Sequence, residues 1–578
     1  MLKIFKNTLA VFFTISVILI GLMVIAGNIS STSIPEPTMY TLTDIYNLIH
    51  NETVDGSHNL YPSSTPTATT SYSVSQIYAD LANLIKRENI ATDTVYLGVT
   101  GDYGNPDPSY ATTSIIASDL VSNGAPDSFG YSLNDICVLI NDNATTTAGE
   151  HSFTSDSAPE STMCTLTYIY TSLADLIEPT KVKVGEKYLG VTGAYCGTLA
   201  SGFFAGDGSA EDPYQICSWT QLNNVRDHLD SDYILTTDLS SADDDDYAGL
   251  GDEWVPIGDG VLYFGGNFNG DWHTISDLII NSTEIDYIGF FGSSVGVISN
   301  IGLINTDITG RCQVGGLVGY LAAGGSISDS YSSDSIVSSD SHCTVGGLGG
   351  LVGYVDSGSS ITDSYFTGQI NSNNDYVGGL VGYFSGTEIS RSYSEGGVSG
   401  NRYVGGLVGF QNSGIIEGSH YLGHSIGGIE QVGGLVGAQN SGSISTSFAE
   451  GNFSAPGPYV GGLVGLSNGT IINSYSDMGA MSQDKVGGLV GCQSNGSIVN
   501  SYSVGGVWGI APIGGLVGLR DSGDESGSFW DIETSGQTES AGGTGTTTMA
   551  MQTPSTFIDA GWSEAIWNLV EGSYPTLK

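Results

Sequence analysis

The sequence predicts a mainly β protein whose C-terminal part is a parallel β-helix, a solenoid in which each coil of strands stacks on the previous coil. A short phrase, VGGLVG in its fullest form, recurs eight times between residues 314 and 518, at intervals of 26 to 34 residues. In most copies, a Ser-aromatic pair follows the phrase after about 15 residues. A fixed period of this length is typical of solenoids and arrays, and no repeat shows the 3.6-residue apolar spacing of a helix.

The glycines of the repeated phrase mark the coils. The first glycine of each copy is Gly315, Gly349, Gly378, Gly405, Gly433, Gly461, Gly487 and Gly514. We expect one period to form two short strands separated by turns of Gly, Ser and Asn, with coils stacked about 4.8 Å apart. We also expect the glycines to adopt positive φ and so to turn the chain within a narrow cross-section. The general preference of parallel crossovers predicts right-handed winding.

These phrases carry a resemblance to a known family. The GGLVG and Ser-Tyr phrases resemble the GLUG motif repeats of bacterial and archaeal surface proteins. The flanking sequences FAGDG at 204–208, DPYQI at 212–216 and SFWD at 528–531 resemble the usual start and end of such repeat domains. The resemblance covers about residues 203–578. It implies a cell-surface β-helix and carries no defined activity.

The N-terminal segment predicts export. Lys3 and Lys6 precede an apolar run over 9–27 that is broken only by Thr14 and Ser16. A charged start followed by an apolar stretch is typical of a signal peptide, and a run of this length is also enough for a retained membrane anchor. Both alternatives place the rest of the chain outside the cytoplasm, either free or associated with the membrane through its N-terminus.

The remaining chain divides into four predicted regions that follow the N-terminal segment 1–37. Residues 38–200 hold a duplicated module, because YLGVTG at 96–101 returns at 188–193, 92 residues later. Each copy predicts two short amphipathic helices and a strand, and we expect a spacer or stalk. Residues 201–310 are expected to form an N-terminal cap and the first coils, with GFFG at 289–292 as a divergent coil. Residues 311–527 form the repeats and 528–578 a C-terminal cap.

Charge excludes one class of partner. The chain has 60 acidic and 14 basic residues, for a formal charge of −46. Such a surface repels phosphate backbones, so nucleic acid is not an expected partner. One carboxylate-rich loop offers oxygen ligands of the kind that calcium prefers, and the alternative is a solvated acidic loop. Its residues are Asp243, Asp244, Asp245, Asp246 and Asp252. No other cofactor is predicted.

Seven cysteines without a CxxC spacing indicate disulfides in an exported chain rather than a zinc or redox motif. The predicted pairs are Cys137 with Cys164, Cys312 with Cys343, and Cys196 with Cys217, which leaves Cys492 unpaired. The first pair occurs only in the second copy of the duplicated module. The second pair precedes two successive Val-Gly-Gly phrases by the same offset, which places it on neighbouring coils. Buried free thiols are the alternative.

The sequence favours a structural or adhesive surface protein over an enzyme, with surface glycans or envelope proteins as partners and no predicted catalytic residue. GLUG repeats also occur in some IgA-specific metallopeptidases, but the HExxH zinc motif is absent from this chain. His420 and His424 lie four residues apart with Tyr421 in place of the needed glutamate, and we expect both histidines in exposed turns. Because some parallel β-helices cleave polysaccharides, the alternative is a polysaccharide-active hydrolase or lyase.

Overall fold

The computed structural model describes the C-terminal solenoid and a few short segments before it. The described residues are 95–96, 99–100, 187–188, 191–192, 196–199, 201–242, 247, 253–282, 285–338, 346–423, 425–510 and 512–578. All of them belong to one compact unit made of residues 85–114 and 170–578. The predicted N-terminal segment 1–37 lies outside the described residues, as does most of the predicted duplicated module.

Both copies of the YLGVTG phrase form a two-stranded antiparallel hairpin. In the first copy β1 (Val95–Tyr96) pairs with β2 (Val99–Thr100), and in the second β3 (Lys187–Tyr188) pairs with β4 (Val191–Thr192). The single strand that we predicted for this phrase is therefore two very short strands that pair with each other. The duplication visible in the sequence is thus also a local structural duplication.

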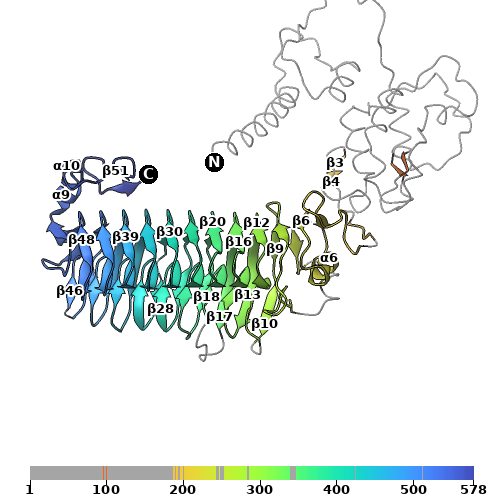
Figure 1. The fold of residues 1–578 in the computed structure, drawn as a ribbon, viewed down its shortest axis with the longest axis horizontal. Helices are drawn as coiled ribbons and strands as arrows, with labels where there is room; N and C mark the ends of the chain where they lie inside the picture. The colour runs from red at the N-terminus through yellow and green to blue at the C-terminus, as the bar shows by residue number, and fades with distance from the viewer. Residues whose placement is uncertain are drawn as a thin grey trace, which may run out of the picture. The chain divides into compact units, whose positions relative to one another are not determined.

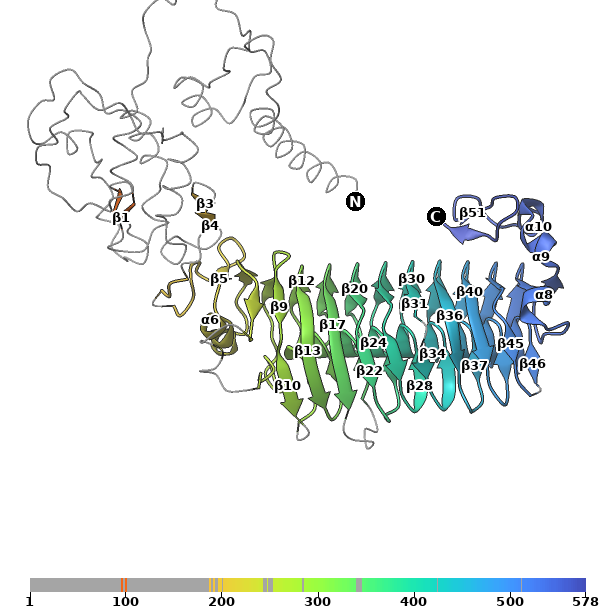
Figure 2. The same cartoon turned by 180° about the vertical axis from the view of Figure 1, so that it is seen from behind.

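The repeats form a parallel β-solenoid, as predicted, and strands of four sheets run along its length (Figures 1 and 2). Equivalent repeat positions pair directly: Gly315 faces Gly349, which faces Gly378, and Ile327 faces Ile361. This register matches the sequence period, so each coil stacks its own motif on the same motif of the next coil. Identical side chains therefore form continuous rows along the solenoid.

One sheet holds the first Val-Gly of each phrase and a second sheet holds the following Val-Gly. The eight strands of the first are β14 (Val314–Gly315), β18 (Leu348–Gly349), β23 (Val377–Gly378), β28 (Arg402–Gly405), β33 (Glu430–Gly433), β37 (Val460–Gly461), β41 (Val486–Gly487) and β46 (Ile513–Gly514). The nine strands of the second are β11 (Phe291–Ser294), β15 (Val318–Leu321), β19 (Val352–Val355), β24 (Val381–Phe384), β29 (Val408–Gln411), β34 (Val436–Gln439), β38 (Val464–Ser467), β42 (Val490–Gln493) and β47 (Val517–Arg520).

The other two sheets lie before and after the Ser-aromatic turn. The twelve strands before it are β5 (Tyr214–Ile216), β6 (Tyr233–Leu235), β8 (Asn267–Asn269), β12 (Val297–Ser299), β16 (Ser326–Ser328), β20 (Ser360–Thr362), β25 (Glu388–Ser390), β30 (Ile415–Glu417), β35 (Ser443–Ser445), β39 (Thr470–Ile472), β43 (Ser497–Val499) and β48 (Asp524–Ser526). The seventeen in the last sheet are β7 (Leu239–Ser240), β9 (Thr274–Ser276), β10 (Ile279–Ser282), β13 (Gly302–Gly310), β17 (Tyr331–Ser338), β21 (Tyr365–Phe366), β22 (Gln369–Asn371), β26 (Tyr393–Ser394), β27 (Gly397–Ser399), β31 (His420–Leu422), β32 (Ile426–Gly427), β36 (Phe448–Ser454), β40 (Tyr475–Met481), β44 (Tyr502–Ser503), β45 (Val507–Trp508), β49 (Phe529–Asp531) and β50 (Thr544–Thr546).

A coil therefore contains at least four strands, where the sequence predicted two. In the coil that begins at Val314, β14, β15, β16 and β17 follow one another. The Gly-Leu of the phrase separates β14 from β15, and a two-residue strand is too short to show alternation in a sequence. Upstream, Phe291 pairs with Val318, so the GFFG phrase is a coil in register, as expected.

The repeat glycines are needed for close backbone packing and not for positive φ, so that prediction was wrong. All eight first glycines lie outside the positive-φ region. A Cβ on Gly433 would instead stand 2.0 Å from the carbonyl oxygen of Val436. The left-handed conformation falls on two rows of other residues: Gln313, Tyr376, Tyr403, Gln431, Tyr459 and Lys485 just before the phrase, and Asp329, Asp363, Arg391, Thr446, Asn473 and Asn500 just before the serine of the Ser-aromatic pair. The solenoid turns there, and the glycines let neighbouring backbones approach.

A buried serine ladder holds the turn that precedes the aromatic residue. The Ser330 backbone N–H donates to Ser364 Oγ at 3.2 Å, and Ser364 Oγ–H donates to the Thr362 carbonyl at 2.7 Å. The same two bonds recur in successive coils as far as Ser528. Each serine thus satisfies a buried backbone N–H of the preceding coil, which is the physical role of the Ser in the Ser-aromatic pair.

Both ends of the solenoid are covered. At the first coils, α6 (Trp219–Asn224) and the 3₁₀ turn η5 (Val225–Asp227) bury Trp219 among core side chains, and Ser218 caps α6. Past the last coil, the backbone N–H of Ala541 donates to Val517 and β50 pairs with β49. The end segments thereby cover strand edges that would otherwise be open for pairing.

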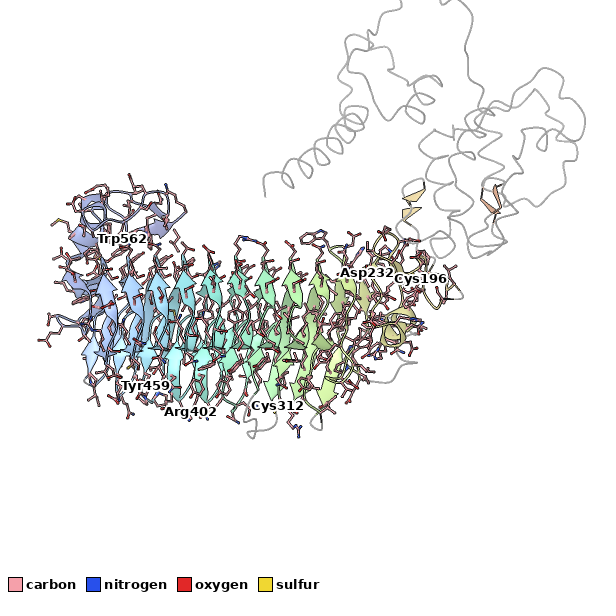
Figure 3. The ribbon with its side chains drawn as sticks, viewed as in Figure 1. Cys196, Asp232, Cys312, Arg402, Tyr459 and Trp562 are labelled. Atoms are coloured by element: carbon pink, nitrogen blue, oxygen red, sulfur yellow. A yellow bond between two sulfur atoms is a disulfide. The ribbon has the colours of Figure 1, made fainter. Side chains whose placement is uncertain are left out.

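Residues 548–578 cover the side of the final coils, whereas the sequence predicted a cap over their end. This segment contains α9 (Thr548–Met551), α10 (Pro554–Ile558) and the antiparallel pair β51 (Trp567–Asn568) with β52 (Thr576–Leu577), and it follows α8 (Ile532–Ser535). It lies beside the coils in both views, and Trp562 belongs to it (Figures 1, 2 and 3). Its aromatic side chains pack against an outer row of the solenoid because that row is itself aromatic.

Candidate functional site: outer aromatic rows and a groove

The aromatic residues of the Ser-aromatic pairs form a stacked row on the outside of the solenoid, which we call the outer ladder. It consists of Tyr331, Tyr365, Tyr393, His420, Phe448, Tyr475, Tyr502 and Phe529. From Tyr331 to Tyr502, neighbouring ring centroids are 4.8 to 5.1 Å apart with interplanar angles of at most 8°. The ring spacing equals the strand spacing, so the parallel register produces the stack directly.

The C-terminal segment covers one end of the outer ladder. Tyr475, Tyr502 and Phe529 are buried against Trp562 and Trp567, and Tyr502 Oη donates to the Pro575 carbonyl at 2.5 Å. The five rungs from Tyr331 to Phe448 stay half exposed in the described structure. The chain itself therefore shows that an aromatic segment can bind along this row.

His420 is a rung of the outer ladder and not a turn residue, so that part of the sequence interpretation was wrong. It lies in β31 between Tyr393 and Phe448, with ring centroids 5.1 and 4.8 Å away. Burial lowers the pKa of His420, and the charges of Glu395 and Glu450 partly oppose that shift. Its ring occupies the position that tyrosine holds in most coils. His424 lies outside the described residues.

Replacing His420 with tyrosine should remove a pH-dependent loss of stability. The folded-state pKa of His420 is depressed, so its contribution is present above the unfolded pKa of about 6.5 and is lost as pH falls through the folded pKa. We expect the stability difference between His420→Tyr and the wild type to grow as pH drops from 7.5 to 5, measured by denaturant unfolding. Phe448→Tyr is the control and should give a flat difference. A flat difference for His420→Tyr as well would contradict the prediction.

A second set of aromatic residues, which we call the tyrosine face, covers another side of the early coils. Its members are Tyr263, Tyr287, Tyr320, Tyr354, Tyr376, Tyr383, Tyr403 and Phe410, and all are half-buried. Tyr354 stacks on Tyr383 at 4.6 Å, and Tyr376 stacks on Tyr403 at 4.7 Å. Both Tyr376 and Tyr403 stand edge-on to Phe410. Half of this face comes from the third residue of the strands that begin Val-Gly-Tyr or Val-Gly-Phe. This recurring aromatic position was not singled out from the sequence.

Polar groups hold the tyrosine face in place and border it. Tyr320 Oη donates to Asp356 at 2.8 Å, and burial together with that carboxylate raises the pKa of Tyr320. The Arg402 guanidinium lies 5.4 Å from the Tyr403 ring and 3.0 Å from Glu430. Arg402 and Tyr459 lie along the same edge of the coils (Figure 3). At neutral pH the face therefore presents neutral phenols, which donate and accept hydrogen bonds.

A groove of about 520 Å³ opens on the seventeen-stranded sheet beside the covered end of the outer ladder. It is lined by Leu422, Glu450, Gly451, Asn452, Asp477, Gly479, Val504, Gly505, Gly506, Trp508 and Thr534. Glycine makes room for the indole here, because a Cβ on Gly506 would stand 2.2 Å from the Trp508 ring. Trp508 is 53% exposed. The groove thus combines glycine positions, one exposed indole that lies over them, and polar side chains.

Two carboxylates stand side by side in this groove. Glu450 and Asp477 are register partners on β36 and β40, and Tyr475 Oη donates to Glu450 Oε1 at 2.8 Å. Burial raises the pKa of Asp477, and the charge of Glu450 raises it further. This pair was not predicted from the sequence, although both acids stand two residues after the ladder aromatic in consecutive repeats. Trp508 was also missed, and it is the single tryptophan of residues 311–527.

The predicted calcium loop and three of the predicted cysteine partners are not among the described residues. Asp243, Asp244, Asp245, Asp246, Asp252, Cys137, Cys164 and Cys343 lie outside the described residues. Cys196 and Cys217 form a disulfide with Cα atoms 5.8 Å apart, Cys312 is also disulfide-bonded, and Cys492 is a buried free thiol. Within the described residues, no cluster of three or more His, Cys, Asp or Glu side chains is arranged to hold a metal ion.

Comparison with known proteins identifies the repeat. Residues 310–337 and 344–371 each match the family model described as the GLUG motif. Over 114 residues the chain is 39% identical to a protein of Evansella cellulosilytica described as a Gly-rich membrane protein, covering 19% of this chain and 12% of that protein. Over 132 residues it is 34% identical to halomucin of Haloquadratum walsbyi, covering 21% of this chain and 1% of that protein. The chain therefore spans only a small part of the length of these relatives.

One solved structure is also similar. It comes from Bacteroides ovatus and is described as an immunoglobulin A1 protease, with 21% identity, a TM-score of 0.31, and coverage of 65% of this chain and 95% of that chain. Among the described residues, none of the helices has the length and apolar character needed to cross a membrane. The two matches to the family model and the strand register together show that the chain carries the GLUG motif and winds it into successive coils of a parallel β-solenoid.

Proposed function

We propose that the chain is an exported cell-surface protein whose solenoid is a rigid, acidic rod that adheres to neutral glycans of the cell envelope or of neighbouring cells. The tyrosine face is the observation that carries this proposal. Eight aromatic side chains lie half-exposed on one side of the early coils, on a chain with a formal charge of −46. The descriptions of the two relatives, a membrane protein and a halomucin, support the surface location.

The chemistry of the tyrosine face favours adhesion to uncharged partners. Tyrosine offers an apolar ring and a hydrogen-bonding hydroxyl on one rigid side chain, which is why it is enriched at recognition surfaces. Sugars present the matching combination of C–H faces and hydroxyl groups. The strong net negative charge of the protein disfavours anionic polymers as partners. Neutral glycans are therefore the partners that this surface can approach.

A polysaccharide-active enzyme is the second candidate, and one observation favours it. Glu450 and Asp477 lie in register on neighbouring strands of the groove, and the pKa of Asp477 is raised. Glycoside hydrolysis uses two carboxylates, one of which is kept protonated as the general acid. Release of reducing sugars from a glycan panel by the full chain, lost in Glu450→Gln and Asp477→Asn, would establish this candidate in place of a purely adhesive role.

A glycan array tests the proposed adhesion. We expect the full-length protein to retain neutral glycans, and the double variant Tyr354→Ala/Tyr383→Ala to lose roughly tenfold or more in affinity, as for central aromatic contacts. The matched control is Tyr331→Ala/Tyr365→Ala, which removes a stacked pair of the same composition from the outer ladder and should bind nearly as the wild type. Absence of binding to neutral glycans, or an equal loss in the control, would contradict the proposal.

A further inference from the structure

We propose that the groove beside Trp508 is a binding subsite for one pyranose unit of a neutral glycan chain. The inference deepens the proposed adhesive function and rests on it, because it names a site and a ligand class apart from the tyrosine face. It stands on the exposure of Trp508, the glycines that make room for the indole, and the polar side chains in the groove lining. Each of these is a separate observation.

The Trp508 ring is exposed to solvent, although buried positions for such a ring exist elsewhere in the chain. Its exposed fraction is 53%, and it lines the groove, whereas its register partner Met481 is 47% exposed outside the lining. The indole depends on the glycines beneath it, since a Cβ on Gly506 would overlap its ring and a Cβ on Gly479 would approach it within 3.4 Å. Glycine at these two positions therefore makes room for the indole.

The groove lining also supplies hydrogen-bonding groups for sugar hydroxyls. Glu450 and Asp477 accept hydrogen bonds, and the Asn452 side chain both donates and accepts. Asn452 is exposed and is in register with Gly479, so its amide borders the same floor as the indole. A pyranose ring fits this arrangement, because its C–H face would lie on the indole while its edge hydroxyls reach the carboxylates and the amide.

Other ligand classes fit the groove less well. Two neighbouring carboxylates repel phosphate, sulfate and uronate groups. A hard cation such as calcium needs six or more oxygen ligands, and within the described residues no cluster of three acidic or other ligating side chains is found. An extended peptide needs a free sheet edge, whereas the floor strands β36 and β40 are paired on both sides, and the Val507 carbonyl of β45 accepts a hydrogen bond from the Gln537 side chain at 2.9 Å. The volume of about 520 Å³ lies within the range of roughly 300–1,000 Å³ for small-ligand sites.

The test measures binding of cellohexaose, mannohexaose and chitohexaose to the full-length protein by titration calorimetry. The protein should be made in a host without N-glycosylation, because Asn452 begins an Asn-X-Ser sequence. We expect Trp508→Ala to weaken binding at least tenfold and Asn452→Ala to weaken it severalfold. Trp272→Ala is the matched control, since Trp272 is 69% exposed and lies in the turn between β8 and β9. It should change affinity less than twofold.

The outcomes separate the two proposals. If the wild type binds one of the hexasaccharides and Trp508→Ala weakens that binding while its melting temperature is unchanged, the groove is the subsite. If the wild type binds and Trp508→Ala and Asn452→Ala bind equally well, the groove inference is wrong and adhesion through the tyrosine face stands. If the wild type binds none of the three sugars and no neutral glycan on the array, both the proposed function and the subsite fail.

Discussion

Replacing Gly434 with valine should unfold the solenoid, whereas deleting the whole coil from Gly433 to Val460 should leave it folded. A Cβ on Gly434 would stand 2.1 Å from the carbonyl oxygen of Gly462 and 2.9 Å from the side chain of Ala449. The first contact is with backbone held by inter-coil hydrogen bonds, so it cannot be relieved by a change of rotamer. We expect a loss of more than about 4 kcal/mol, the range of severe core disruptions.

The deletion removes 28 residues and leaves every junction in register. Val432 takes the place of its own register partner Val460, so the coil closes onto the next coil without a shift. Inside the last sheet, Tyr421 then neighbours Ser476 in place of Ala449, and both of these are small buried residues. Because each coil contacts only its neighbours, a stack with one coil fewer keeps the same set of interfaces.

Thermal melts followed by circular dichroism distinguish the two changes. Gly427→Val is the matched control for the substitution, since Gly427 also lies in a strand of this region and the nearest atom to its added Cβ is Ser399 Oγ at 3.3 Å. It should melt close to the wild type. The deletion should also melt cooperatively and shorten the solenoid by roughly 4.8 Å. Unfolding by the deletion together with a neutral Gly434→Val would show that the coil register is wrong.

The repeat itself made the architecture predictable from the sequence. The fixed interval of the glycine phrase gives the register of every coil in advance, and pairs such as Gly405 with Gly433 follow from it directly. The buried isoleucines before the aromatic residue, such as Ile389 and Ile416, were visible in the same way. Periodicity predicts which residues share a row, because the row is set by the repeat and not by any local propensity.

Features that depend on the shape of one coil could not be predicted in this way. The two-residue strands and the left-handed turn residues, such as Tyr376 and Lys485, arise from how the chain bends around a crowded interior. The groove depends on glycine at positions 479 and 506, because a Cβ on either residue would meet the Trp508 ring. In the sequence, Trp508 looks like any other strand residue, and only the structure shows that it lies over these glycines.

The serine ladder leads to the second large expected effect, a loss of stability in Ser447→Ala. Ser447 is fully buried; its Oγ accepts the Ser419 backbone N–H at 3.1 Å and donates to the Ser445 carbonyl at 2.7 Å. Alanine removes both bonds and leaves the Ser419 N–H buried without that acceptor. A buried unsatisfied group costs roughly 1–3 kcal/mol, so the melting temperature should fall clearly. A hydroxyl missing from one coil leaves the neighbouring rungs intact, so the effect should stay local and unfolding should stay cooperative.

The matched control for this prediction is Ser357→Ala, which removes a hydroxyl from an exposed turn of the same solenoid. Chemical denaturation of both variants should show the full loss for Ser447→Ala and almost none for Ser357→Ala, since exposed polar groups are satisfied by water in either state. Equal stability of the two variants would mean that the backbone at this turn finds another partner. The serine ladder would then be a consequence of the turn geometry and not one of the interactions that hold the coils together.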